Sequence, residues 1–258
     1  RAVFVESIAN PGGVITDIAA IAKVAHDGGV PLIVDNTLAS PYLCRPIEHG
    51  ADIVVHSLTK FLGGHGNSMG GAIIDSGCFD WAASDKFGYL TQPNPSYHGK
   101  VFTEAFGPAA FIVACRALGL RDLGPSISPF NAFMILTGIE TLPLRMQRHA
   151  DNALAVAKWL EANPKVEWVS YAGLEGNPYH AMAQRYTPKG AGSVFTFGVK
   201  GGYAAGVKLV GAVKLFSHLA NLGDTRSLII HPASTTHRQL PEKDHAAAGA
   251  GPDVVRLS

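Results

Sequence analysis

The sequence predicts an α/β protein with a mainly parallel sheet and flanking helices, followed by a smaller α+β region. Short apolar segments typical of buried strands alternate with helical segments over the first part of the chain, and this alternation builds a parallel sheet. A long helical segment then leads into further strands and helices. With 258 residues, 47% of them hydrophobic, the chain can bury one large core, or a large and a small one.

The first strand and helix follow from the apolar pattern. Residues 2–5 form an apolar run of strand type, and Thr16 can cap a helix that Gly28 and Gly29 end. The apolar residues of that helix recur on one face: Ile18, Ile21, Ala22 and Ala25. Residues 30–34 form the second predicted strand.

The next part of the chain continues the alternation and then becomes irregular. Residues 45–50 favour a helical turn, 52–56 a third strand and 69–74 a fourth. Residues 84–108 contain several prolines, glycines and aromatic residues, which favours a long irregular or broken-helical segment. Long connections of this kind are often functional.

A long helix is predicted to link two domains. Ser128 is an N-cap followed by proline, and the helical pattern continues through 150–162 and stops before Pro164. We therefore expect a large domain over 1–140 and a small domain over 141–258.

The small domain is predicted to mix strands and helices. Residues 166–171 and 194–199 are typical of strands. One helix face is predicted to hold four apolar residues: Leu209, Ala212, Val213 and Phe216. Residues 254–258 are again of strand type. Since the chain starts and stops inside apolar strands, we expect a polypeptide truncated at both ends, with an edge strand at each terminus as the alternative.

Composition and charge argue against several kinds of partner. The 21 Lys and Arg residues nearly balance 20 Asp and Glu residues, giving a net charge of +1, so we expect neither nucleic acid nor an anionic membrane as partner. The longest uninterrupted apolar run, 109–115, is far shorter than a membrane-spanning helix.

Cysteine and histidine spacing argues against bound metals. The three cysteines are far apart and form no CxxC pair: Cys44, Cys78 and Cys115. This spacing disfavours disulfides and a thiolate zinc site, and it favours a cytoplasmic location. The 11 histidines include no HExxH motif, so we expect no metal site.

The strongest chemical signal is Lys60, which follows the predicted strand at 52–56. Ligands bind at the carboxyl ends of strands in open α/β sheets. A lysine there is costly to desolvate unless it is paired or chemically used, and a partly desolvated amine is a candidate for Schiff-base formation. A solvated lysine at the start of a loop is the alternative.

Three more polar residues belong to the same predicted sheet edge. Asp35 ends the preceding strand. A buried carboxylate there can pair with a cation such as the pyridinium nitrogen of pyridoxal 5'-phosphate, or serve as a helix cap or salt-bridge partner. Ser57 and Thr59, two residues apart, could each donate a hydroxyl hydrogen bond to a phosphate oxygen.

Several short motifs occur in a fixed order along the chain: Glu6 to Pro11, Val34 to Thr37, Ser57 to Phe61, Ser128 to Phe130, Leu222 to Asp224, His231 to Ser234 with His237, and Val255 to Ser258. Together they resemble the cysteine and methionine metabolism family of pyridoxal-phosphate enzymes. The resemblance covers nearly the whole chain, and it implies the pyridoxal-phosphate-dependent transferase fold of type I.

The resemblance also implies cofactor-binding roles. Lys60, the catalytic residue, would hold pyridoxal 5'-phosphate as a Schiff base. Asp35 would pair with the pyridinium nitrogen, and Ser57 and Thr59 would contact the phosphate. Asn10 resembles the residue that hydrogen-bonds the phenolic oxygen of the cofactor.

Two further residues are implied to bind the substrate. Arg256 resembles the arginine that grips the substrate α-carboxylate, which suits a guanidinium group. Asn221 stands near that carboxylate, where the lyases tend to carry serine. In the family, a glycine-containing phosphate loop and an aromatic residue that stacks on the cofactor ring both precede the position of residue 1.

Within the family, residues 87–99 most resemble the sulfhydrylase branch that acts on O-acetylhomoserine, and residues 221–226 do so more weakly. The expected reaction is γ-replacement in methionine biosynthesis: O-acetylhomoserine and sulfide, or a thiol, give homocysteine and acetate, with Lys60 as base at Cα. A methionine γ-lyase, a cystathionine γ-synthase-like enzyme and a non-catalytic scaffold or interface fragment stay open as alternatives. The family usually assembles as a homotetramer.

Overall fold

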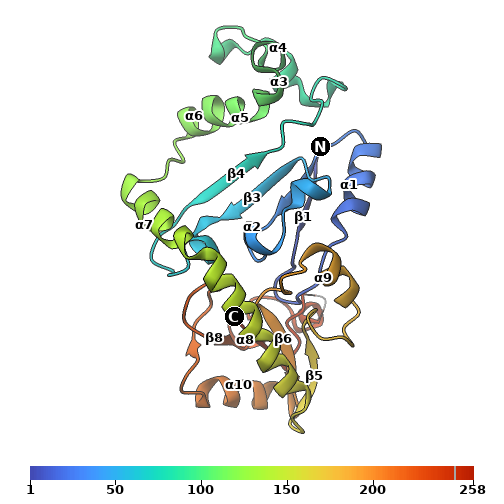
Figure 1. The fold of residues 1–258 in the computed structure, drawn as a ribbon, viewed down its shortest axis with the longest axis vertical. Helices are drawn as coiled ribbons and strands as arrows, with labels where there is room; N and C mark the ends of the chain where they lie inside the picture. Colours follow the sequence, from blue (N-terminus) through green and yellow to red (C-terminus); the bar gives the residue numbers. More distant parts are fainter. Residues whose placement is uncertain (247) are drawn as a thin grey trace.

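The computed structural model describes residues 1–246 and 248–258 and contains two β-sheets (Figure 1). The first sheet has the order β1-β2-β3-β4. Its strands are β1 (Val3–Glu6), β2 (Leu32–Asp35), β3 (Ile53–Ser57) and β4 (Gly71–Asp75). The first three are parallel, as predicted, but β4 runs antiparallel to β3. Residues 58–70, between these two strands, form only a short helical turn and an irregular segment, and they contain no crossover helix of the kind that usually connects parallel strands.

Helix α1 (Ile18–Asp27) connects β1 to β2 and ends at Gly28, as predicted. Its N-cap is Asp17 rather than Thr16, since the Asp17 carboxylate accepts a hydrogen bond from the first turn. The Thr16 hydroxyl instead donates to the backbone carbonyl of Glu6 at 2.6 Å. The prediction for Thr16 was wrong because this hydroxyl is already used by the neighbouring strand.

Short turns connect β2 to β3 and follow β3. The chain forms α2 (Ser40–Leu43) and a 3₁₀ turn at Pro46–His49, which confirms the predicted helical turn. Directly after β3 comes a single π-helical turn, Leu58–Leu62. The carboxyl ends of β2 and β3 therefore lie beside this turn.

The segment that follows β4 is a series of short helical pieces, as predicted for 84–108. They are, in chain order, Asp85–Phe87, α3 (Gly88–Thr91), Pro95–Tyr97, α4 (Phe102–Phe106), Gly107–Ala109, α5 (Ala110–Ala114), Cys115–Leu120 and α6 (Arg121–Leu123). Figure 1 shows α3 to α6 at the end of the molecule farthest from the second sheet. They enclose a separate apolar cluster that includes Trp81, Phe87 and Leu90.

The last of these pieces form one helical stretch, Phe102–Leu123. Its 22 residues, with a mean hydropathy of 1.2, are long and apolar enough by length and composition to cross a membrane. The uninterrupted apolar run 109–115 is only part of this stretch, which continues through polar and charged residues on both sides. Ala110, Ala114 and Ala117 of this stretch belong to the apolar cluster around Trp81.

Two helices, rather than the predicted single one, lead to the second sheet. α7 (Pro129–Glu140) is capped by the Ser128 side chain, as predicted. α8 (Leu142–Glu161) follows after Thr141, whose φ of −100° and ψ of 6° interrupt the helix. Pro143 lies just beyond, and it has no N–H to continue the helical hydrogen bonds.

The second sheet has the order β5-β6-β9-β8-β7. The elements of this half are, in chain order, β5 (Val166–Ser170), α9 (His180–Tyr186), β6 (Phe195–Val199), α10 (Gly202–Ala212), β7 (Ser217–His218), β8 (Leu228–Ile230), the 3₁₀ turn Pro232–Ser234, α11 (Glu242–His245) and β9 (Val254–Leu257). The predicted α+β character is confirmed.

Helix α10 is shorter than the apolar pattern indicated. It ends at Ala212, and Val213 has an extended backbone with a ψ of 143°. Val213 and Phe216 therefore do not share its face as predicted. Both residues instead line one apolar cavity together with Leu209, which explains the apolar spacing without a longer helix.

One apolar cluster joins the two halves of the molecule. It contains Ile8 and Val34 from the first half and Phe195 and Val255 from the second. Figure 1 shows α8 running from the region of the first sheet along the second. The boundary between residues 140 and 141 stays a prediction, and it falls where α7 gives way to α8.

Candidate active site

Lys60 lies in the π-helical turn after β3, and its own backbone is not helical, with φ −93° and ψ −130°. Its side chain is partly buried, and Nζ donates a hydrogen bond to Asn221 Oδ1 at 2.5 Å. Burial lowers the pKa of the Lys60 amine, and the positive charge of Arg256 lowers it further. A larger share of neutral amine makes this lysine a better nucleophile and base.

Arg256 connects Asn221 and Asn10 from the middle of the second sheet. It lies on β9, which is flanked by β6 and β8. Its Nη2 donates to the backbone carbonyl of Asn221 at 2.8 Å, and its Nη1 donates to Asn10 Oδ1 at 3.0 Å. Three residues predicted to belong to one site therefore meet around Lys60, although they come from opposite ends of the chain.

The Arg256 guanidinium is buried, which lowers its pKa below that of a solvated arginine. Arginine nevertheless stays charged. Its Nε is also buried and has no hydrogen-bond partner among the residues that the structure describes. The site therefore holds a fixed positive charge, of the kind that recognises a carboxylate.

Asp35 ends β2, and one of its carboxylate oxygens accepts the backbone N–H of Thr37 at 2.8 Å. The Thr37 hydroxyl in turn accepts the backbone N–H of Ser57 at 2.8 Å. Thr37 thus ties the ends of β2 and β3 together and fixes Asp35 relative to Ser57. This link leaves the other Asp35 oxygen for a ligand.

Thr59 is the second predicted phosphate contact, and its hydroxyl already forms hydrogen bonds with the backbone. Its hydroxyl accepts the N–H of Gly70 at 3.2 Å and lies 3.4 Å from the Gly70 carbonyl. Ser57 and Thr59 are both partly buried. Ser57 is the last residue of β3 and Thr59 lies in the lysine-bearing turn, and their contact with a phosphate stays a prediction.

The sequence interpretation gave no role to Thr37, Glu6 or His56, although all three surround Asp35. Glu6 is the register partner of Asp35 on β1, and its carboxylate accepts the backbone N–H of Asn10 at 3.1 Å. Burial raises the pKa of Glu6, and the charge of Asp35 raises it further. Burial lowers the pKa of His56, partly offset by Asp35. Glu6 and Thr37 belong to two of the motifs that carry the family resemblance, and this membership was the available signal.

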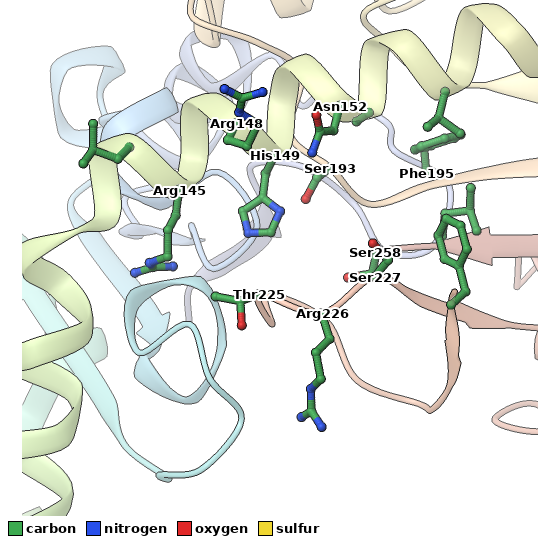
Figure 2. Close-up of a pocket in the computed structure, with 15 residues that line it drawn as sticks. Arg145, Arg148, His149, Asn152, Ser193, Phe195, Thr225, Arg226, Ser227 and Ser258 are labelled. Carbon is green, nitrogen blue, oxygen red and sulfur yellow. The ribbon is translucent and has the colours of Figure 1, made fainter. Parts of the chain in front are cut away.

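The cavity drawn in Figure 2 lies beside the lysine-bearing turn and does not include Lys60. Its volume is about 350 Å³, and its polar lining includes Arg145, His149 and Thr225. Figure 2 shows His149 and Ser193 pointing into it from α8 and from the segment before β6. The cavity is connected to the lysine-bearing turn through Arg145, which lines it and also donates a hydrogen bond to the Phe61 carbonyl.

Cysteines and metal ligands do not contribute to the site as described. Cys44 is buried, and burial raises the pKa of its thiol to about 12, which leaves it unreactive. Within residues 1–246 and 248–258, no group of three or more His, Cys, Asp or Glu side chains is arranged to hold a metal ion. The side chains that can take part in catalysis are therefore those around Lys60.

Comparison with known proteins places the chain in a family. The family model described as "Cys/Met metabolism PLP-dependent enzyme" matches residues 1–258. The O-acetyl-L-homoserine sulfhydrylase of Leptospira meyeri is 54% identical over 267 residues, covering all of this chain and 60% of the relative. The homocysteine synthase of Schizosaccharomyces pombe is 52% identical over 260 residues, covering all of this chain and 61% of the relative. The chain thus spans about three fifths of these relatives' length.

Solved structures agree in fold. A putative O-acetylhomoserine (thiol)-lyase of Campylobacter jejuni, solved with N'-pyridoxyl-lysine-5'-monophosphate, matches with a TM-score of 0.95 and 39% identity, covering 100% of this chain and 62% of that one. Cystathionine gamma synthase of Xanthomonas oryzae pv. oryzae, in complex with aminoacrylate and cysteine, matches with a TM-score of 0.80 and 34% identity, covering 100% and 58%. The type I fold expected from the motifs is confirmed. With the lysine, carboxylate and arginine gathered as described, the chain belongs to the Cys/Met metabolism family of PLP-dependent enzymes.

Proposed function

We propose that the protein catalyses a γ-replacement reaction, in which O-acetylhomoserine and sulfide give homocysteine and acetate. In this exchange the Cγ–O bond to acetate breaks and a Cγ–S bond forms. The observation that carries the proposal is the contact of Lys60 Nζ with Asn221, whose backbone carbonyl is held by Arg256. The activities named for the relatives in Leptospira meyeri and Schizosaccharomyces pombe support the choice of substrate class.

The residues present fit pyridoxal 5'-phosphate. Lys60 supplies an amine of lowered pKa for its aldehyde carbon, and Asp35 supplies a carboxylate oxygen for its ring nitrogen. Ser57 and Thr59 supply hydroxyls for its phosphate, and Asn10 supplies an amide group for its phenolic oxygen. When bound, the cofactor provides an electron sink for a carbanion at the substrate Cα.

Residues of the chain transfer the proton, bind the substrate and orient the reactive amine. Lys60 moves a proton at the substrate Cα, a role that its lowered pKa favours. Arg256 binds the α-carboxylate of the amino-acid substrate through its buried guanidinium. Asn221 orients the Lys60 amine through the 2.5 Å hydrogen bond. Asp35 keeps the ring nitrogen protonated.

Colour and substrate assays test this function. The protein loaded with pyridoxal 5'-phosphate should be yellow, should lose its colour on treatment with borohydride, and should stay colourless in the Lys60→Ala variant. O-acetylhomoserine with sulfide should give homocysteine and acetate. Release of an oxo acid and ammonia without sulfide would indicate a γ-lyase, and efficient use of cysteine in place of sulfide would indicate a cystathionine γ-synthase. If the protein binds no cofactor, the proposed reaction is excluded, and a non-catalytic scaffold or interface role remains as the explanation.

The assembly and location follow the same proposal. We propose a cytoplasmic homotetramer with small-molecule substrates, and with no nucleic-acid, membrane or metal partner. Helix α7 carries three large apolar side chains that are mostly exposed, Phe130, Phe133 and Leu136, and such patches are typical of protein interfaces. Light scattering of the purified protein would check the assembly, and a monomer would contradict it.

A further inference from the structure

The backbone carbonyls that follow Lys60 have no helical partners. The π-helical turn ends at Leu62, so the carbonyl groups near its end must find other donors. The carbonyls of Phe61 and Leu62 both accept hydrogen bonds from one side chain: Arg145 Nη1 donates to the Phe61 oxygen at 2.7 Å, and Nη2 donates to the Leu62 oxygen at 3.2 Å. The Gly64 carbonyl accepts the backbone N–H of Thr225 at 2.9 Å.

Arg145 also fixes the joint between α7 and α8. Its Nη2 donates to the Gly138 carbonyl at 2.7 Å, and its Nε donates to the Thr141 hydroxyl at 3.1 Å. The guanidinium is partly buried, and burial lowers its pKa, but an arginine keeps its charge. One planar cation therefore ties the lysine-bearing turn to the end of one helix and the start of the next.

Close backbone packing holds the same turn from two other sides. A Cβ added at Gly138 would lie 2.1 Å from the Gly63 carbonyl oxygen, and one added at Gly223 would lie 2.4 Å from the Phe61 nitrogen. Gly223 is two residues from Asn221, the partner of Lys60 Nζ. The turn is thus enclosed by α7, by α8 and by the loop that supplies Asn221.

The Phe61 ring extends this contact into α8. It is fully buried, and its edge faces the His149 ring at a centroid distance of 5.5 Å and an angle of 82°. Burial and the charge of the nearby Arg145 both lower the pKa of His149, and the charge of Asp224 offsets part of this lowering. Figure 2 shows Arg145 and His149 projecting from one side of α8, while Arg148 points away.

We propose that Arg145 is a positioning residue for Lys60, which acts by holding the carbonyls of the two residues that follow the lysine. Lysine has a long, flexible side chain, so Nζ meets a cofactor and Asn221 reproducibly only if its backbone is fixed. A shift of about 1 Å at a reacting group can cost about a hundredfold in rate. This inference rests on the proposed cofactor role of Lys60.

The test compares Arg145→Lys and Arg145→Gln with Arg148→Lys and Arg148→Gln in the protein loaded with pyridoxal 5'-phosphate. Arg148 is on the same helix and is exposed. An ammonium group cannot span the carbonyls of the turn and of Gly138 together, and glutamine loses the charge. A hydrogen bond to a charged group is worth roughly 10- to 100-fold in an equilibrium constant, and the proposal makes cofactor binding depend on the geometry that these hydrogen bonds hold. We expect weakening in this range for both Arg145 variants, and no change for the Arg148 variants.

Spectroscopy separates positioning from simple destabilisation. In the Arg145 variants we expect a shifted pH midpoint of the visible absorbance of the bound cofactor and a lower kcat with a nearly unchanged KM. A lower melting temperature with an unshifted absorbance titration would overturn the proposal. If Arg145→Gln does not fold, the absorbance titration and the kinetic constants of Arg145→Lys alone test the proposal. A wild-type protein without Lys60-dependent colour contradicts the proposed function, whereas a coloured wild type with unaffected Arg145 variants contradicts only this inference.

Discussion

Lys60 Nζ and Asn221 Oδ1 lie 2.5 Å apart, although the two residues are separated by 161 positions in the chain. The hydrogen bond connects the turn after β3 to the loop before β8, and thereby the two halves of the molecule. Arg256 holds the Asn221 backbone carbonyl at the same time. The reactive amine is therefore oriented by the half of the chain that does not contain it.

Replacing Asn221 with alanine should remove the hydrogen bond to the Lys60 amine. In Asn221→Ala, Lys60 loses its hydrogen-bond acceptor, and we expect kcat to fall by about tenfold, the effect of one hydrogen bond to a charged group. Cofactor binding should change less, because the backbone carbonyl that Arg256 contacts remains. Steady-state kinetics and cofactor titration check this. An unchanged kcat would show that Asn221 does not orient the amine.

The cofactor-free protein should gain stability as the pH rises toward the ordinary lysine pKa. The folded-state pKa of Lys60 lies below its usual value of 10.5. Between the two values the unfolded chain binds a proton that the folded chain does not, so the free energy of unfolding rises with pH across this window. Urea denaturation at several pH values should show a flatter dependence for Lys60→Met. Lys23→Met, an exposed control on α1, should keep the wild-type slope.

Asp35→Asn should keep the fold but lower the activity. The amide oxygen can still accept the Thr37 N–H, while the negative charge is lost. Since the charge of Asp35 raises the pKa of both Glu6 and His56, both values should fall in the variant. NMR titration of the His56 ring measures this directly, and kcat should drop by about a hundredfold or more. A His56 pKa that does not move would contradict the described arrangement.

Arg256→Lys should mainly weaken substrate binding. A lysine cannot contact the Asn10 side chain and the Asn221 carbonyl in the forked manner of the guanidinium. We expect the KM for the amino-acid substrate to rise by about 10- to 100-fold. Arg226→Lys is the matched control, because Arg226 is exposed and pairs with Asp224. Equal effects of the two substitutions would argue against a substrate role for Arg256.

Gly138→Ala should destabilise the protein through the lysine-bearing turn. The added Cβ would overlap the Gly63 carbonyl oxygen at 2.1 Å, and overpacking of this kind costs about 1–3 kcal/mol. In Gly211→Ala, on α10, the added Cβ would meet no atom of the described residues within 4 Å, so this substitution should be neutral or slightly stabilising. Thermal unfolding of the two variants provides the comparison, and similar melting temperatures would contradict the close contact.

The sequence predicted best the residues that follow buried strands. Asp35 and Lys60 could be placed at one sheet edge because parallel strands bring their carboxyl ends together. Arg256 and Asn10 could be assigned only through the resemblance to a known family. The short strands and the α7 N-cap also followed from local patterns.

Features that depend on distant contacts could not be predicted in this way. Arg145 lies 84 residues from Phe61, whose carbonyl it binds, and nothing local to either residue indicates the pair. Thr16 failed as an N-cap because β1 uses its hydroxyl. The apolar spacing after Leu209 reflected a shared cavity rather than a longer helix.

Arg256 lies on a central strand, β9, so its position in the site tolerates less change than the positions of residues on loops. β9 is hydrogen-bonded on both sides, to β6 and to β8, so moving its guanidinium means disrupting the sheet itself. Asn221, by contrast, stands on a loop outside the strands. Directed evolution of substrate preference should therefore accumulate changes around residues 219–226 and leave the strand that carries Arg256 untouched.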